Sequence, residues 1–129
     1  MGAGPEGTVQ WTRVPDPSAD PVATRLQVES STAFAGGEGI WFHDRVVYFS
    51  TKGDNRIWAY ETDTAVLSII YDAATSSTPI LTGVDNLTVS PAGDILVAEG
   101  GDDGGERWAV DIEHHEEHHC EQQIEHQGQ

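Results

Sequence analysis

The stretch GEGIWFHDRVVYFST, residues 37–51, decides the fold of this 129-residue chain. It holds two runs of β-branched and aromatic residues around a short polar break, and successive side chains of an extended strand point to opposite sides. Ile40 and Phe42 therefore share one side, while Trp41 and His43 share the other. A tight break between two such runs predicts an antiparallel β-hairpin. Because both sides are largely apolar, the sheet needs a neighbour on each face.

Similar runs recur along the chain, separated by turn residues such as Gly, Asp, Asn, Ser and Pro. This pattern predicts a meander of antiparallel strands and hence an all-β fold. The expected strands are Leu26–Ser30, Gly39–His43, Val46–Thr51, Arg56–Glu61, Val66–Tyr71, Asn86–Ser90 and Asp94–Glu99.

A weak internal repeat relates residues 38–49 to residues 85–98. The offset is about 47 residues, close to the roughly 40–50 residues of a four-stranded propeller blade. The intervening hairpin, residues 56–71, would complete the first blade, so we expect a partial β-propeller of about one and a half blades. Propellers close with roughly four to eight blades. We therefore expect the chain to be too short to close the ring, and copies to self-associate so that open blade edges are covered.

Composition divides the chain into an extended Pro-rich arm (1–24), a propeller-blade segment (25–104) and an acidic, His-rich tail (105–129). The tail has too little apolar surface to order itself, so we expect it to be disordered or a polar helix. Histidines four apart, such as His114 and His118, could bind Zn²⁺ on a helix. Nothing around them promises the supporting contacts of a specific site, which favours an incidental tail.

The charge balance is strongly acidic, with 22 Asp and Glu against 6 Lys and Arg and a net charge of −16. Such a surface repels phosphate backbones and anionic lipids, so we expect neither nucleic acid nor membrane partners. It suits hard cations such as Ca²⁺, although a solubilising surface explains it equally well. We expect no export signal and no membrane-spanning run in the chain as written, and its lone Cys120 excludes an intrachain disulfide.

Two carboxylates stand just before the first strand of their repeat units, Glu38 and Asp85. In a propeller they would lie near the channel opening on adjacent blades and could share a cation that clamps a phosphoryl oxygen. The alternative, which the residue pattern alone favours, is that each accepts hydrogen bonds in a turn. His43 and Asp44 could serve as an acid–base pair, but their place in a tight hairpin favours a surface turn.

Three stretches resemble the PhoX-type alkaline phosphatases, a family of bacterial β-propellers. They are residues 37–51, RIWAY at 56–60 and DNLTVSPAGDILVAE at 85–99, and the similarity extends over about residues 11–103. The resemblance implies a periplasmic or extracellular phosphomonoesterase with iron and calcium at one mouth of the channel. It also implies that Glu38 and Glu99 are metal ligands, with Asp85 and Asn86 at a second oxygen-rich stretch. The family's upstream region, which supplies a metal-bound Cys, has no counterpart here.

The resulting hypothesis is a fragment of a PhoX-like phosphatase that hydrolyses phosphate monoesters when complete and is inactive alone. Its metal residues would be Glu38, Asp85, Asn86 and Glu99, with Ca²⁺ as the expected metal and iron implied by the resemblance only. Two alternatives stay open: a non-catalytic calcium-binding propeller module, and a calcium-dependent lactonase-like propeller hydrolase.

Overall fold

The computed structural model describes residues 6–76, 81, 83–100 and 106–108. Within these residues the chain forms strands and one short 3₁₀ turn, and no α-helix. The elements are β1 (Gly7–Thr8), η1 (Thr24–Leu26), β2 (Gly37–His43), β3 (Val46–Thr51), β4 (Arg56–Glu61), β5 (Val66–Asp72), β6 (Val84–Val89), β7 (Ile95–Gly100) and β8 (Glu106–Trp108).

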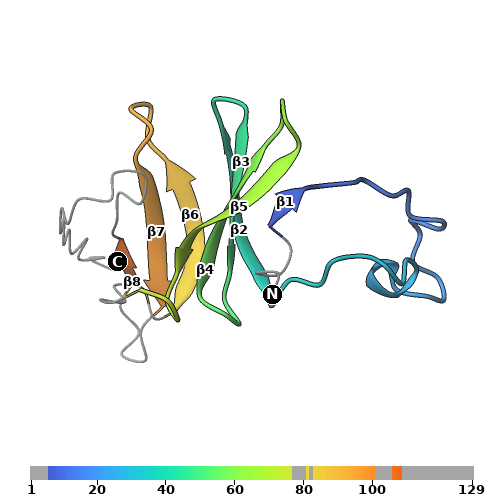
Figure 1. Ribbon diagram of the computed structural model, residues 1–129. Helices are drawn as coiled ribbons and strands as arrows, with labels where there is room; N and C mark the ends of the chain where they lie inside the picture. Colours follow the sequence, from blue (N-terminus) through green and yellow to red (C-terminus); the bar gives the residue numbers. More distant parts are fainter. Residues whose placement is uncertain (1–5, 77–80, 82, 101–105, 109–129) are drawn as a thin grey trace.

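The strands form two antiparallel sheets (Figure 1). The larger sheet has the strand order β1-β5-β4-β3-β2, and the smaller has the order β6-β7-β8. The expected all-β class, the antiparallel meander and the six hairpin strands from residue 37 onward are therefore confirmed. Strands β1 and β8 were not predicted, and they extend the two sheets by one strand each. The expectation of a disordered or helical tail, residues 105–129, is wrong at residues 106–108, which form β8, and the other residues of the tail lie outside the described residues.

The strand predicted at Leu26–Ser30 is wrong. The segment instead begins with the last residue of η1, where the Leu26 and Gln27 amides donate to the carbonyls of Ala23 and Thr24. Leu26 is 67% exposed and so has no core to pack against. The Gln27 amide group donates to the carbonyl oxygens of Asp16 and Val22, which fixes a compact loop in place of a strand.

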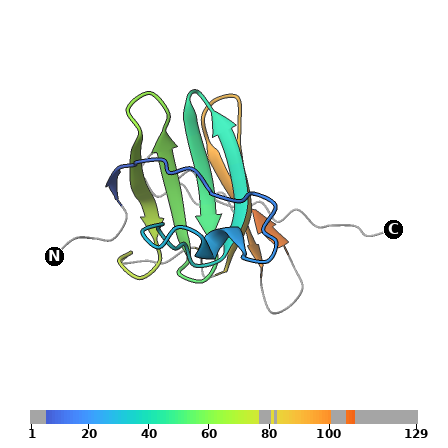
Figure 2. The ribbon, with the colours of Figure 1, turned by 90° about the vertical axis from the view of Figure 1, so that its right-hand side faces the viewer.

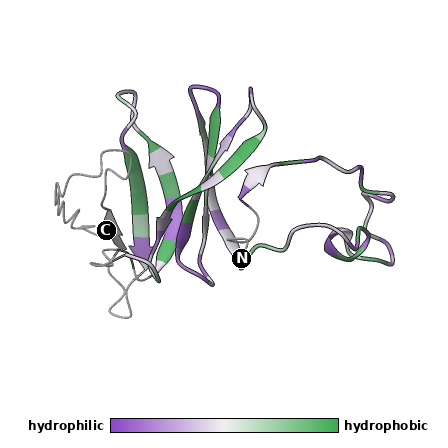
Figure 3. Cartoon of the chain, in the orientation of Figure 1, coloured by the Kyte–Doolittle hydropathy of each residue, from purple (hydrophilic) through white to green (hydrophobic). Residues whose placement is uncertain are grey.

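The core lies between the two sheets. Its fully or nearly buried members are Tyr48, Ile57, Leu81, Val84, Leu87, Val89, Ile95 and Val97. Strand alternation sends Ile57 and Ala59 of β4 to this side and Trp58 and Tyr60 to the other, as the sequence predicts. The hydropathy colouring accordingly places apolar segments in the strands, with hydrophilic loops joining β2 to β3 and β3 to β4 (Figure 3).

The arm that leads from β1 to β2 lies on the side of the other face of the larger sheet, and most of it projects away from the sheet (Figures 1 and 2). Phe34 of the arm meets Phe49 and Trp58 edge-on, with ring centroids 5.2 Å away in both cases. Trp11 donates its indole N–H to the Tyr60 hydroxyl at 2.9 Å. The smaller sheet therefore packs on one face, and Phe34 and Trp11 contact part of the other, while Ile40 and Phe42 stay exposed. The two-sided hydrophobic pattern is thus satisfied only in part.

Candidate functional site

A single serine joins the starts of the two repeated strands. Ser50 of β3 is fully buried. Its Oγ accepts a hydrogen bond from the Gly39 amide at 2.9 Å and donates one to the carbonyl oxygen of Asp85 at 2.5 Å. The backbone beside Glu38 is thus held next to the backbone of Asp85, so the structure brings together the two strand starts that the repeat singles out.

Gly39 allows this approach because it has no side chain. A Cβ atom there would lie 2.5 Å from the Leu87 backbone nitrogen and 2.7 Å from Asn86 Oδ1, both closer than van der Waals contact permits. Strands β2 and β6 therefore meet through backbone at this point. The role of this glycine was not predicted, since the close approach depends on two segments that are about 47 residues apart in the repeat.

The Asp85 carboxylate forms an ion pair with a lysine and occupies space that a glycine leaves open. Its Oδ1 lies 3.2 Å from Lys52 Nζ, and the two side chains are 33% and 49% exposed. Its Oδ2 lies 2.5 Å from the position that a Cβ of Gly100 would occupy, so glycine at the end of β7 leaves space for the carboxylate. Neither Lys52 nor Gly100 was predicted as a neighbour of Asp85.

The turn between β3 and β4 adds a second contact at the same place. The Asn55 side-chain oxygen accepts a hydrogen bond from the Val84 amide at 3.2 Å. Asn55 has a φ of +50°, a left-handed conformation in which asparagine is one of the commoner non-glycine residues. The turn that carries Lys52 is therefore fixed against the start of β6 by both a side-chain ion pair and a side-chain to backbone bond.

The remaining predicted residues lie at the same end of the sheets, where β2 and β6 begin and β7 ends (Figure 1). Glu38 is exposed. Asn86 is also exposed, and its Oδ1 accepts a hydrogen bond from the Leu87 amide at 2.9 Å. Glu99 is half-buried and pairs in register with Val84. Within the described residues, however, no three His, Cys, Asp or Glu side chains gather closely enough to hold a metal ion.

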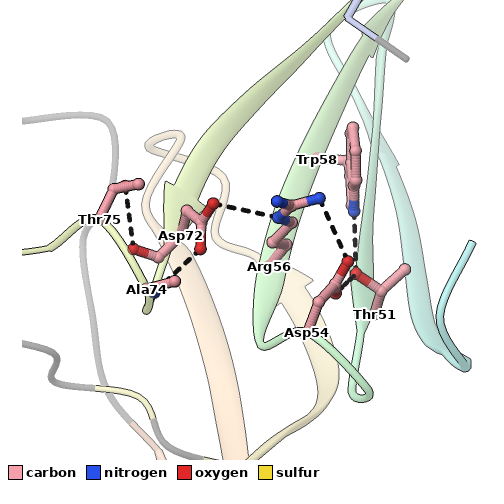
Figure 4. A network of polar contacts seen from close by, with 7 residues as sticks. All are labelled: Thr51, Asp54, Arg56, Trp58, Asp72, Ala74 and Thr75. Carbon is pink, nitrogen blue, oxygen red and sulfur yellow. Dashed lines mark hydrogen bonds and ion pairs between the residues drawn. The ribbon is translucent and has the colours of Figure 1, made fainter. Parts of the chain in front are cut away.

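An arginine-centred network stabilises the turns at this end (Figure 4). The Arg56 guanidinium lies between Asp72, at 3.1 Å, and Asp54, at 3.4 Å, and its centre is 5.7 Å from the Trp58 ring centroid. Trp58 donates its indole N–H to Thr51 Oγ1, which in turn bonds to Asp54. Because the Asp54 and Asp72 carboxylates are already paired with Arg56, this network stabilises the turns and does not offer free ligands for a metal ion.

His43 and Asp44 lie at the opposite end, in the hairpin between β2 and β3. His43 pairs with Val46, so the turn has two residues, and both have positive φ, +47° at Asp44 and +66° at Arg45. Arg45 pairs with Asp63 at 2.9 Å in an exposed contact. These features agree with the predicted surface turn. The His-rich tail, with His114 and His118, lies outside the described residues.

Comparisons of the chain with models of known protein families, with curated proteins and with solved structures found no match. The resemblance to PhoX-type phosphatases therefore rests on the quoted stretches of sequence alone. Among the described residues, no helix has the length and hydrophobicity needed to cross a membrane.

Proposed function

We propose that the two sheets are adjacent blades of a β-propeller and that the end where β2 and β6 begin contributes to a calcium-centred phosphomonoesterase site. The observation that carries this proposal is the Ser50 contact, which joins the starts of the first strands of the two repeat units. The strand order supports it as well. Strands β2 to β5 form a four-stranded meander, and the next unit begins with β6 against the first strand of the previous unit.

The charge at this end supports a cation site. Glu38, Asp85 and Glu99 are three carboxylates at one end of the sheets, and Asp85 already attracts the Lys52 ammonium. The described residues alone do not fit a complete Ca²⁺ site, since Ca²⁺ takes about six to eight oxygen ligands. Further ligands would come from other blades, supplied either by additional sequence or by other copies of this chain. Nothing in the described residues favours iron, for which the resemblance is the sole support.

In such a site the chain's own residues would have separate tasks. The carboxylates would hold the cation, which supplies Lewis-acid stabilisation of a phosphoryl oxygen when bound. Lys52 is close enough to Asp85 to exchange this partner for a phosphate oxygen once a divalent ion takes its place.

Calcium titration of the full chain by calorimetry tests the metal part. We expect binding that Asp85→Asn and Glu38→Gln each weaken at least tenfold. The matched control is Asp63→Asn, which removes an ion-paired carboxylate at the opposite end of the larger sheet. Equal effects at Asp85 and Asp63 would refute the calcium site.

Inorganic phosphate, the product of the proposed reaction, tests the phosphatase part separately. We expect phosphate to bind in the presence of Ca²⁺ and the Lys52→Met variant to lose that binding while keeping the metal. Calcium binding without any phosphate binding would leave a metal module and reject the phosphomonoesterase.

One observation favours a second candidate, a non-catalytic module. The Lys52 ammonium already neutralises Asp85, and Gly100 shapes the space around the carboxylate, so the contact can serve to join the sheets without a metal. In that case Ca²⁺ would not bind, and removal of Lys52 would lower stability by no more than an exposed ion pair contributes, about 1 kcal/mol or less.

A further inference from the structure

Strand β2 is an edge strand of the larger sheet as far as the described residues extend. Its central residues Ile40, Trp41 and Phe42 are 67%, 45% and 62% exposed, which makes three large apolar side chains in succession. Soluble proteins usually protect such an edge with charge, proline or a bulge, because its unpaired backbone groups can accept another strand. The middle of β2 carries neither charge nor proline, and the bulge of this strand lies before it, between Gly37 and Ile40.

The backbone hydrogen bonds determine which groups of β2 face outward. His43 and Val46 flank a two-residue turn, so they form a hydrogen-bonded pair. An independent contact agrees with this assignment, because the Arg45 carbonyl accepts a hydrogen bond from the Thr62 amide at 2.9 Å. The backbone groups of Arg45 therefore point toward β4, and those of the next residue, Val46, point toward β2. Because the direction alternates, Trp41 also faces β3. Ile40 and Phe42 therefore direct their N–H and C=O groups away from the sheet.

This pattern is self-complementary. If a second copy of β2 runs antiparallel and the two strands are centred on Trp41, Ile40 of each copy lies opposite Phe42 of the other. Both residues direct their backbone groups outward, so each opposed pair exchanges two N–H···O=C bonds, four in all. Ile40 and Phe42 then pack on one face, and the two Trp41 side chains meet on the other as a non-hydrogen-bonded pair. We infer that two copies of the chain associate through β2 in this register.

The association is weak by its area. Three half-exposed side chains from each copy bury on the order of 600 Å² in total, below the roughly 1,200–2,000 Å² of stable interfaces. Each copy also carries a net charge of −16, and the mutual repulsion is screened by salt. The dimer should therefore strengthen as ionic strength rises, in contrast to an interface held by opposite charges.

This inference does not rest on the proposed function. In a closed propeller ring the first strand of a blade faces the channel, so pairing through β2 concerns copies whose ring is not closed. A chain that binds Ca²⁺ and phosphate but stays monomeric would reject the pairing and leave the proposed function intact.

Sedimentation equilibrium of the full chain at low and high salt tests the association. We expect a monomer–dimer equilibrium with a dissociation constant of about 10–1,000 µM at 0.5 M salt, in the range of weak interfaces. Ile40→Lys should raise this constant at least tenfold. Leu26→Lys is the matched control, since Leu26 is also 67% exposed but lies on the arm. A chain that stays monomeric at millimolar concentration, or equal effects of the two lysines, would overturn the pairing.

Disulfide formation tests the register. In a chain with Cys120→Ser, Trp41→Cys would face its own counterpart with Cβ atoms about 4.5–5.5 Å apart, close to disulfide geometry. We expect oxidised glutathione to link this variant into dimers several-fold faster than an Ile40→Cys variant, whose thiol faces Phe42 of the second copy. Equal rates for the two variants would overturn the register centred on Trp41.

Discussion

Replacing Ser50 with alanine removes the hydroxyl that joins the two sheets. The Gly39 amide and the Asp85 carbonyl then lose their hydrogen-bond partner. Ser50 is fully buried, so water does not reach its position to replace the hydroxyl. Each buried polar group that loses its partner costs about 1–3 kcal/mol, so we expect a loss of about 2–4 kcal/mol. For a domain with about 5–15 kcal/mol of total stability, this is a large fraction.

Urea unfolding followed by tryptophan fluorescence measures this loss, because Trp58 is nearly fully buried and reports on the larger sheet. The matched control is Ser68→Ala. Ser68 is half-buried on β5, and its hydroxyl makes a long contact of 3.5 Å with the Ala59 carbonyl. We expect the control to lose less than about 0.5 kcal/mol, as is usual away from buried networks. If the two alanine variants lose the same stability, the Ser50 contact does not hold the sheets together.

Three further substitutions test separate contacts by the same unfolding assay. Gly39→Ala should cost about 1–3 kcal/mol, because its Cβ would overlap backbone of β6, whereas Gly37→Ala, with nothing within 4 Å, should cost less than about 1 kcal/mol. Arg56→Met should cost about 1–3 kcal/mol, because Asp54 and Asp72 lose their ion-pair partner. The resulting shift of the unfolding midpoint should be smaller at high salt than at low salt. Phe34→Ala should cost about 1–2 kcal/mol and increase protease cleavage of the arm, while Leu26→Ala should leave both unchanged.

The hairpins from residue 37 onward could be predicted because their signals are local. Each strand from β2 to β7 carries its own run of β-branched or aromatic residues, and the turns between them are rich in Gly, Asp and Asn. The strand predicted at Leu26–Ser30 failed for the complementary reason. A short apolar-polar alternation predicts a strand only if a sheet offers a partner, and among the described residues no strand pairs with the segment around the exposed Leu26.

The contacts between the sheets could not be predicted in the same way. The repeat relates Glu38 to Asp85, but the atoms that join these segments belong to Ser50, which lies on a different strand. Likewise Lys52 and Gly100 surround the Asp85 carboxylate from separate parts of the chain. Strand β1 is only two residues long, and its partner β5 lies far along the sequence, with β2, β3 and β4 between them. Local periodicity therefore could not reveal β1.

The pairing pattern of the strands has a consequence for the order of folding. From β2 to β5, and again from β6 to β8, each strand pairs with its neighbour in sequence. Such local hairpins close on the order of microseconds, before long-range contacts are made. We therefore expect the two sheets to assemble separately and to meet late, at the step that buries Ser50. A weakened contact at that serine should then speed unfolding far more than it slows folding.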